Sequence, residues 1–141
     1  MKELAIVAKT ENLDAVLDFV SEQLETADCP MKSQTQIAIA VEEIFVNIAH
    51  YAYEPADDRP PEVGGTLIRI TVGDEVVIEF EDEGKPYNPL EKDDPDITTG
   101  TEEREIGGLG IFMVKNIMDA VEYRREEGKN VLLIKKAFKA N

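Results

Sequence analysis

Residues 66–82 read TLIRITVGDEVVIEFED. Apolar and polar residues alternate over 66–72 and again over 75–81, which is the pattern of strands with one buried face. Gly73-Asp74 stands between the two runs, and a short junction containing glycine is typical of a tight hairpin. We therefore predict two antiparallel strands joined by this turn, with Asp82 at the end of the second strand.

The segments on either side of this hairpin carry alternating or helical patterns. The predicted elements are a strand at 2–9, helices at 12–26 and 33–53, the hairpin strands, a helix at 110–120, and a closing hairpin of 120–124 and 130–137. This order predicts an α+β fold: a two-layer α/β sandwich with a mainly antiparallel sheet and helices on one face. Because the length suits one hydrophobic core, we expect a single domain over residues 1–141.

Residues 84–107 contain several prolines and many charges but no sustained period. A loop of this length is uncommon in a compact domain unless it has a function. We interpret it as a mobile lid.

The first functional motif is Glu43-x-x-x-Asn47 in the second predicted helix. The two side chains lie one turn apart, on a stripe that we expect to face away from the main apolar one. The amide oxygen of Asn47 can hold Mg²⁺ while the carboxylate of Glu43 polarises a hydroxyl or water for attack on phosphorus. The alternative is a solvated helix face, because this short motif is common.

The second motif is Asp82-x-Gly84. Asp82 follows an apolar strand, so its carboxylate is expected at the mouth of the core, where it needs a donor such as the exocyclic amine of a purine. Gly84 lets the backbone approach a flat ring closely. The alternative is an ordinary turn, which Asp and Gly favour by themselves.

The third motif is Gly107-Gly108-Leu109-Gly110, which we expect to stand immediately before a helix. Free N–H groups and the positive end of the helix dipole favour a phosphate there. The sequence is neither a Walker loop nor a dinucleotide fingerprint. A hinge or close helix packing is the alternative.

Composition limits the partners. The 141 residues include 30 acidic and 15 basic residues, a net charge of -15, which argues against nucleic acid and anionic membranes as partners. The single cysteine, Cys29, cannot form an internal disulfide. There is no signal-peptide pattern and no apolar run of about 18 residues, so we expect a cytoplasmic protein.

The three motifs, in this order, resemble the ATP site of the GHKL superfamily. The segments DEGKPYNP (82–89) and GGLGIFMV (107–114) are most similar to the stand-alone bacterial anti-sigma factor serine/threonine-protein kinases. The resemblance implies a Bergerat-type ATP-binding fold. It also implies a role for each motif residue. Glu43 would be the catalytic base and Asn47 the Mg²⁺ ligand, while Asp82 would accept a hydrogen bond from the adenine amine and Gly84 would let the ring approach the backbone. The phosphates would be contacted by Gly108, Leu109 and Gly110.

By the same resemblance, the chain is expected to be a Mg-ATP-dependent serine/threonine protein kinase that acts as an anti-sigma factor. Its partners would be a sigma factor and a small anti-anti-sigma protein of the STAS type, which it would phosphorylate. A homodimer is compatible with the resemblance. Two alternatives stay open: an ATP-responsive binding module without kinase activity, and a detached histidine-kinase catalytic domain.

Two positions depart from the pattern of the relatives. Many relatives have His or Lys four residues after the metal-binding Asn, where this chain has Tyr51, with His50 one place earlier. We interpret His50 as a helix-packing residue. Some relatives carry Thr after the glycine of the last hairpin, where this chain has Lys129 and Asn130, which weakens any phosphate contact from that hairpin.

Overall fold

The computed structural model describes residues 1–52, 64–91 and 106–139. Its strands are β1 (Lys2–Val7), β2 (Gly65–Val72), β3 (Glu75–Asp82), β4 (Ala120–Glu126) and β5 (Lys129–Ala137). Its helices are α1 (Leu13–Thr26), α2 (Met31–Asn47) and α3 (Ile106–Ile117), and α2 continues as a π-helical turn, η2 (Ile48–Ala52). Two short 3-10 turns lie at Thr10–Asn12 and Pro89–Glu91.

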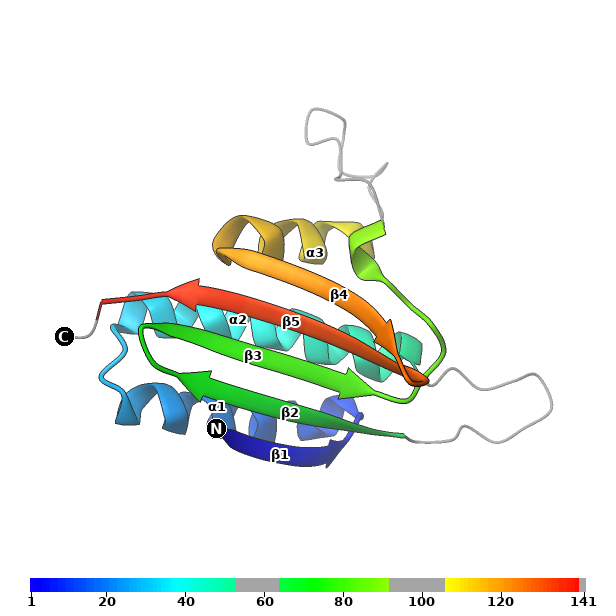
Figure 1. Ribbon diagram of the computed structural model, residues 1–141, viewed down its shortest axis with the longest axis horizontal. Coiled ribbons are helices and arrows are strands. Elements are labelled where there is room, and N and C mark those ends of the chain that lie inside the picture. Colours follow the sequence, from blue (N-terminus) through cyan, green and yellow to red (C-terminus); the bar gives the residue numbers. More distant parts are fainter. Residues whose placement is uncertain (53–63, 92–105, 140–141) are drawn as a thin grey trace.

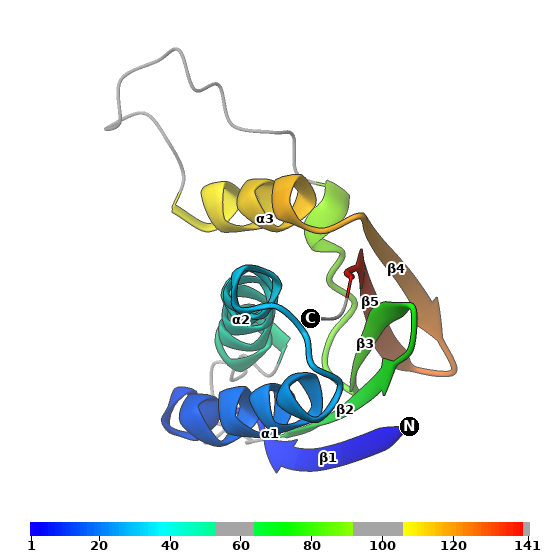
Figure 2. The same ribbon diagram turned by 90° about the vertical axis from the view of Figure 1, so that its left-hand side faces the viewer.

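The strands form one antiparallel sheet in the order β1-β2-β3-β5-β4. The three α-helices lie on one face of this sheet, with α2 between α1 and α3 (Figure 1 and Figure 2). The α+β sandwich predicted from the sequence is therefore confirmed. Because β5 pairs with β3, the last hairpin returns beside the end of β3, where Asp82 faces Asn130.

The core consists of buried residues of the sheet and the helices that pack against each other. The inward-facing strand residues Ile68, Ile78 and Phe80 are at most 1% exposed, as are Ile37 and Phe45 of α2. Full burial of one such side chain stabilises the fold by about 1.5–3 kcal/mol. This packing fixes α2 against the sheet and so positions its polar residues.

Two predicted helices had wrong boundaries. α3 begins at Ile106, so Gly107–Gly110 forms its first turns and does not precede it. Glycine disfavours a helix by about 1 kcal/mol per residue, but burial of Ile111 and Val114 against the core overrides this preference. The predicted helix over 33–53 starts earlier, at Met31, and its α-helical part ends at Asn47, where the π-helical turn begins.

The outer face of the sheet carries ion pairs. Arg69 pairs with Glu3 at 2.8 Å and with Glu79 at 3.3 Å, and Arg124 pairs with Glu79 at 3.0 Å. Within the described ranges, no helix is long and apolar enough to span a membrane. Most of the predicted lid, residues 92–105, lies outside the described residues.

Candidate functional site

A hollow opens where the end of α2 faces β3, β5 and β4. It holds about 390 Å³ of free space, a volume that includes solvent at its open mouth. Most of its walls are apolar, and three amide or carboxylate side chains reach it. The lining residues are Ile44, Asn47, Ile48, Ala52, Asp82, Tyr87, Pro89, Ile111, Tyr123, Asn130 and Leu132.

Asp82 lies in the floor of the hollow and is 5% exposed. Its Oδ1 accepts hydrogen bonds from the backbone N–H of Gly84 at 3.0 Å and from Nδ2 of Asn130 at 2.9 Å. Burial raises the pKa of the Asp82 carboxyl, while these two hydrogen bonds and the charge of Arg125 act in the opposite direction. Because both bonds use Oδ1, Oδ2 is left to accept from a donor in the hollow.

Asn47 reaches the same hollow from the last turn of α2. It is 8% exposed, and its buried Nδ2 finds no hydrogen-bond partner within the described part of the chain. An unpaired buried amide costs about 1–3 kcal/mol. Since either end of an amide can be turned toward the hollow, Asn47 is a polar group that a ligand can satisfy.

Glu43 lies one turn before Asn47 and contacts α3. A Cβ placed on Gly110 would lie 1.9 Å from Glu43 Oε1, so only glycine leaves room for the carboxylate. Burial, and secondarily the neighbouring charge of Glu42, raise the pKa of the Glu43 carboxyl. The structure thus brings the first and third motifs together at the contact between α2 and α3.

The stripe of α2 that contains Glu43 includes buried residues. Ala40 is fully buried and Asn47 nearly so, because α3 packs on this side of α2. The alternative of a solvated helix face is thereby excluded for these residues.

Packing in the fold requires a glycine at position 84. Its Cβ would lie 2.3 Å from the carbonyl oxygen of Ala52, which also accepts from Lys85 N at 3.0 Å. Arg125 Nη1 donates to the carbonyl of Gly84 at 2.8 Å. The close approach seen here is therefore between Gly84 and the end of η2, and close approach of a purine ring stays a prediction.

Gly108 and Leu109 lie in the first turn of α3. The first four N–H groups of an α-helix have no partner within the helix, so the amides of these residues belong to the open end of α3. A phosphate contact at this end stays a prediction.

The sequence interpretation missed Asn130 as a central residue. It lines the hollow, is 5% exposed, and hydrogen-bonds Asp82 and Tyr123. Its neighbours along the chain give no signal for this role, because the contact arises from the pairing of β3 with β5.

A contact between two aromatic residues also escaped prediction. The rings of Tyr51 and Tyr87 stack with centroids 5.6 Å apart at 26°. His50 is exposed and contacts the ring of Tyr51 edge to face at 6.1 Å, so its interpretation as a helix-packing residue was wrong. His50 lies in the π-helical turn that follows α2.

An antiparallel sheet covered on one face by helices, with a polar-floored hollow beside the middle helix, is the architecture of one class of nucleotide-binding domain. Residues 6–136 match the family described as histidine kinase-like ATPase domain. The chain belongs to this family, which confirms the resemblance to the GHKL superfamily. Membership in an ATPase family implies that the chain binds ATP.

Individual relatives carry more specific names. An anti-sigma F factor from Caldanaerobacter subterraneus subsp. tengcongensis is 28% identical over 134 residues, 94% of this chain and 90% of that protein. The serine/threonine-protein kinase BtrW from Bordetella bronchiseptica is 26% identical over 98 residues, 70% of this chain and 66% of that protein. The crystal structure of the RsbU and RsbW domains of Rv1364c from Mycobacterium tuberculosis shares the fold with a TM-score of 0.62 at 12% identity; the match covers all of this chain and 34% of that one.

Proposed function

We propose that this protein is a Mg-ATP-dependent serine/threonine kinase that acts as an anti-sigma factor. The observation that carries the proposal is the meeting of Glu43 with Gly110 at the start of α3, beside the hollow that Asn47 and Asp82 line. The names of the relatives, an anti-sigma factor and a serine/threonine kinase, support the same assignment.

In the proposed complex, adenine enters the hollow and its amine donates to Oδ2 of Asp82. The N–H groups of Gly108 and Leu109 meet the phosphates at the open end of α3. Asn47 would hold Mg²⁺ through its side-chain oxygen, the kind of ligand that Mg²⁺ prefers, because its buried Nδ2 is a donor and cannot bind the ion. A bound Mg²⁺ supplies positive charge that neutralises the phosphate oxygens.

In the proposed transfer, the hydroxyl oxygen of the protein substrate forms a bond to the γ-phosphorus, and the bond from this phosphorus to the bridging oxygen of ADP breaks. ADP leaves with the bonding electron pair, and the hydroxyl proton passes to the carboxylate of Glu43. A raised pKa brings Glu43 closer to the working pH, which suits a general base.

The substrate is proposed to be a serine or threonine of a small STAS-type anti-anti-sigma protein, and the second partner a sigma factor. With a net charge of -15, the surface suits basic partner surfaces. We further propose one cytoplasmic domain over residues 1–141 with a lid at about 84–107, and a homodimer as its assembly.

The test is transfer of label from radiolabelled ATP to a candidate STAS-type partner. Glu43→Gln should reduce transfer by about a hundredfold or more while ATP binding persists. Glu22→Gln, which changes an exposed carboxylate of α1, is the matched control and should keep a rate near that of the wild type. A wild-type rate in Glu43→Gln would contradict the role of this residue.

The same assay separates the two alternatives. A binding module without kinase activity would bind a partner in response to ATP but transfer no label. A detached histidine-kinase domain would give an acid-labile product, whereas phosphoserine and phosphothreonine keep their label in acid.

A further inference from the structure

Asn130 uses its full capacity for hydrogen bonds within the site. Its Nδ2 donates to Asp82 Oδ1 at 2.9 Å and to the carbonyl of Lys85 at 2.8 Å. Its Oδ1 accepts from the N–H of Tyr87 at 3.2 Å and from the hydroxyl of Tyr123 at 2.5 Å. An amide side chain offers two donor hydrogens and an oxygen that accepts two bonds. All four positions are occupied, at a residue that is 5% exposed.

The partners of Asn130 fix which way its amide faces. The hydroxyl of Tyr123 and the N–H of Tyr87 are donors here, so they hold the oxygen of the amide on their side. The NH₂ group is thereby directed at Asp82. A reversed amide would place its oxygen against a carboxylate oxygen and lose these bonds, which strongly disfavours that state.

The bond from Asn130 in turn determines the state of Asp82. Together with the N–H of Gly84 it occupies Oδ1 and prevents free rotation of the carboxylate. Donors on Oδ1 favour the ionised form, which is a pure acceptor. Oδ2 is then presented to the hollow as an oriented acceptor.

We propose that Asn130 is the positioning residue that gives the hollow its preference for a purine with an exocyclic amine, because it holds Oδ1 of Asp82 and leaves Oδ2 to that amine. This inference rests on the proposed nucleotide function. Asn130 acts through Asp82 and touches no reacting atom. Asn130 also links Asp82 to the backbone of Lys85 and Tyr87 through hydrogen bonds.

The experiment compares the affinities for ATP and for purine riboside triphosphate, which lacks the amine, by calorimetric titration with Mg²⁺. Asn130→Ala should weaken ATP binding about tenfold and leave binding of purine riboside triphosphate within about twofold. Asn12→Ala is the matched control, because Asn12 donates one bond to the carbonyl of Val7 at 2.9 Å, at a partly exposed position outside the hollow. It should leave both affinities unchanged.

An isosteric variant, Asn130→Asp, decides the question if the alanine variant does not fold. Two carboxylates would then face each other, one at position 82 and one at position 130. The charge of Arg125 acts on the carboxylate of Asp82, and the hydroxyl of Tyr123 donates to the side chain at position 130. Such a pair shares a proton, so the affinity for ATP should fall as the pH rises, while that for purine riboside triphosphate stays nearly flat.

The outcomes separate this inference from the proposed function. A wild type that binds ATP no better than purine riboside triphosphate overturns the amine contact, and the inference with it. A wild type that prefers ATP, with variants that keep the same preference, overturns the role of Asn130 alone. Equal losses for both nucleotides would show that Asn130 only supports the fold.

Discussion

At the scale of single residues, Gly110 has a role that its place in a glycine-rich motif does not reveal. It leaves the space that the carboxylate of Glu43 occupies, since a Cβ there would lie 1.9 Å from Oε1 and 2.0 Å from Cδ. The obstructed atoms are the end of a flexible side chain, so Gly110→Ala should displace Glu43 without unfolding the protein. Alanine also favours a helix by about 1 kcal/mol.

We therefore expect Gly110→Ala to melt at or above the temperature of the wild type and to transfer phosphate about a hundredfold more slowly, because a displaced base loses its alignment. Thermal melting and the labelled-ATP assay measure the two effects. Gly73→Ala is the control, since no heavy atom lies within 4 Å of its added Cβ. A fully active Gly110→Ala variant would show that the position of Glu43 is not critical.

The raised pKa of Glu43 also predicts how stability depends on pH. Burial disfavours the charged form in the folded state, so the folded protein holds this proton more tightly than the unfolded chain. The stabilising contribution is complete below the unfolded pKa and is lost as the pH rises through the raised folded value. Glu43→Gln should therefore have a higher free energy of unfolding than the wild type at neutral pH, and this difference should vanish in acid.

Urea denaturation of both proteins over a pH series measures this difference. Asp82, whose pKa is also raised, is present in both proteins and cancels in the comparison. A difference that does not change with pH would show that the ionisation of Glu43 does not affect stability.

At the scale of elements, local patterns predicted what local forces determine. The hairpin at 66–82 follows from alternation and a turn, and β2 and β3 form at 65–72 and 75–82. The pairing of β5 with β3 joins residues far apart in the sequence, so no local pattern placed Asn130 opposite Asp82. Burial of α3 likewise outweighed the poor helix propensity of its glycines. This explains why the helix begins at Ile106 and not at the predicted residue 110.

Another non-local contact joins the end of η2 to the segment that follows β3. A Cβ at Gly84 would lie 2.3 Å from the oxygen and 2.7 Å from the carbonyl carbon of Ala52, and these backbone atoms are held by packing. Gly84→Ala should lower the free energy of unfolding by about 2–3 kcal/mol, the cost of overpacking, whereas Gly73→Ala should change it by less than about 0.5 kcal/mol. Urea denaturation distinguishes these values. Equal stability of the two variants would mean that the contact with Ala52 is not rigid.

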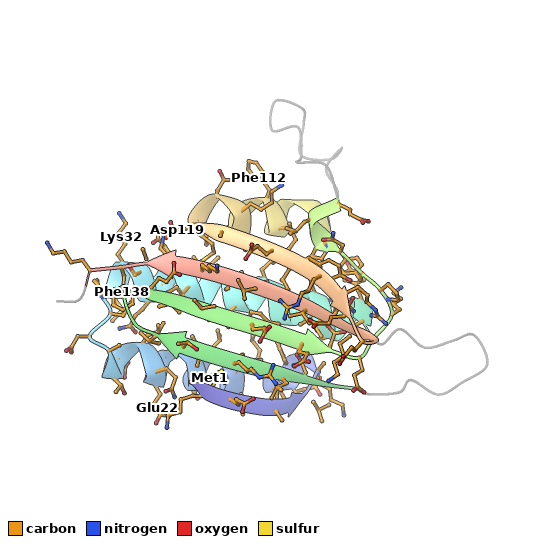
Figure 3. The ribbon with its side chains drawn as sticks, viewed as in Figure 1. Met1, Glu22, Lys32, Phe112, Asp119 and Phe138 are labelled. Atoms are coloured by element: carbon orange, nitrogen blue, oxygen red, sulfur yellow. The ribbon has the colours of Figure 1, made fainter. Side chains whose placement is uncertain are left out.

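At the scale of the whole molecule, the net charge of -15 means that carboxylates repel one another in the folded state, and this repulsion lowers the free energy of unfolding. α1 shows it most clearly, because its sequence has no Lys or Arg and its Asp18, Glu22 and Glu25 are exposed. Figure 3 shows Glu22 projecting away from the sandwich. Salt screens such repulsion, but it also weakens the ion pairs on the outer face of the sheet. Since acidic residues outnumber basic ones two to one, repulsion should dominate.

We therefore expect the melting temperature to rise by about 2–4 °C between about 0.05 M and 0.5 M salt, as a stabilisation near 1 kcal/mol would produce. The combined variant Asp18→Asn, Glu22→Gln and Glu25→Gln, which neutralises three carboxylates of α1, should have a higher melting temperature at low salt. Its melting temperature should also rise less when salt is added.

Glu25 lies in the last turn of α1, where the helix dipole already disfavours a negative charge. Glu3→Gln, which removes the 2.8 Å pair with Arg69, should not raise the melting temperature. A melting temperature that falls with salt would show that the ion pairs of the sheet, and not the excess of carboxylates, govern the electrostatic part of stability.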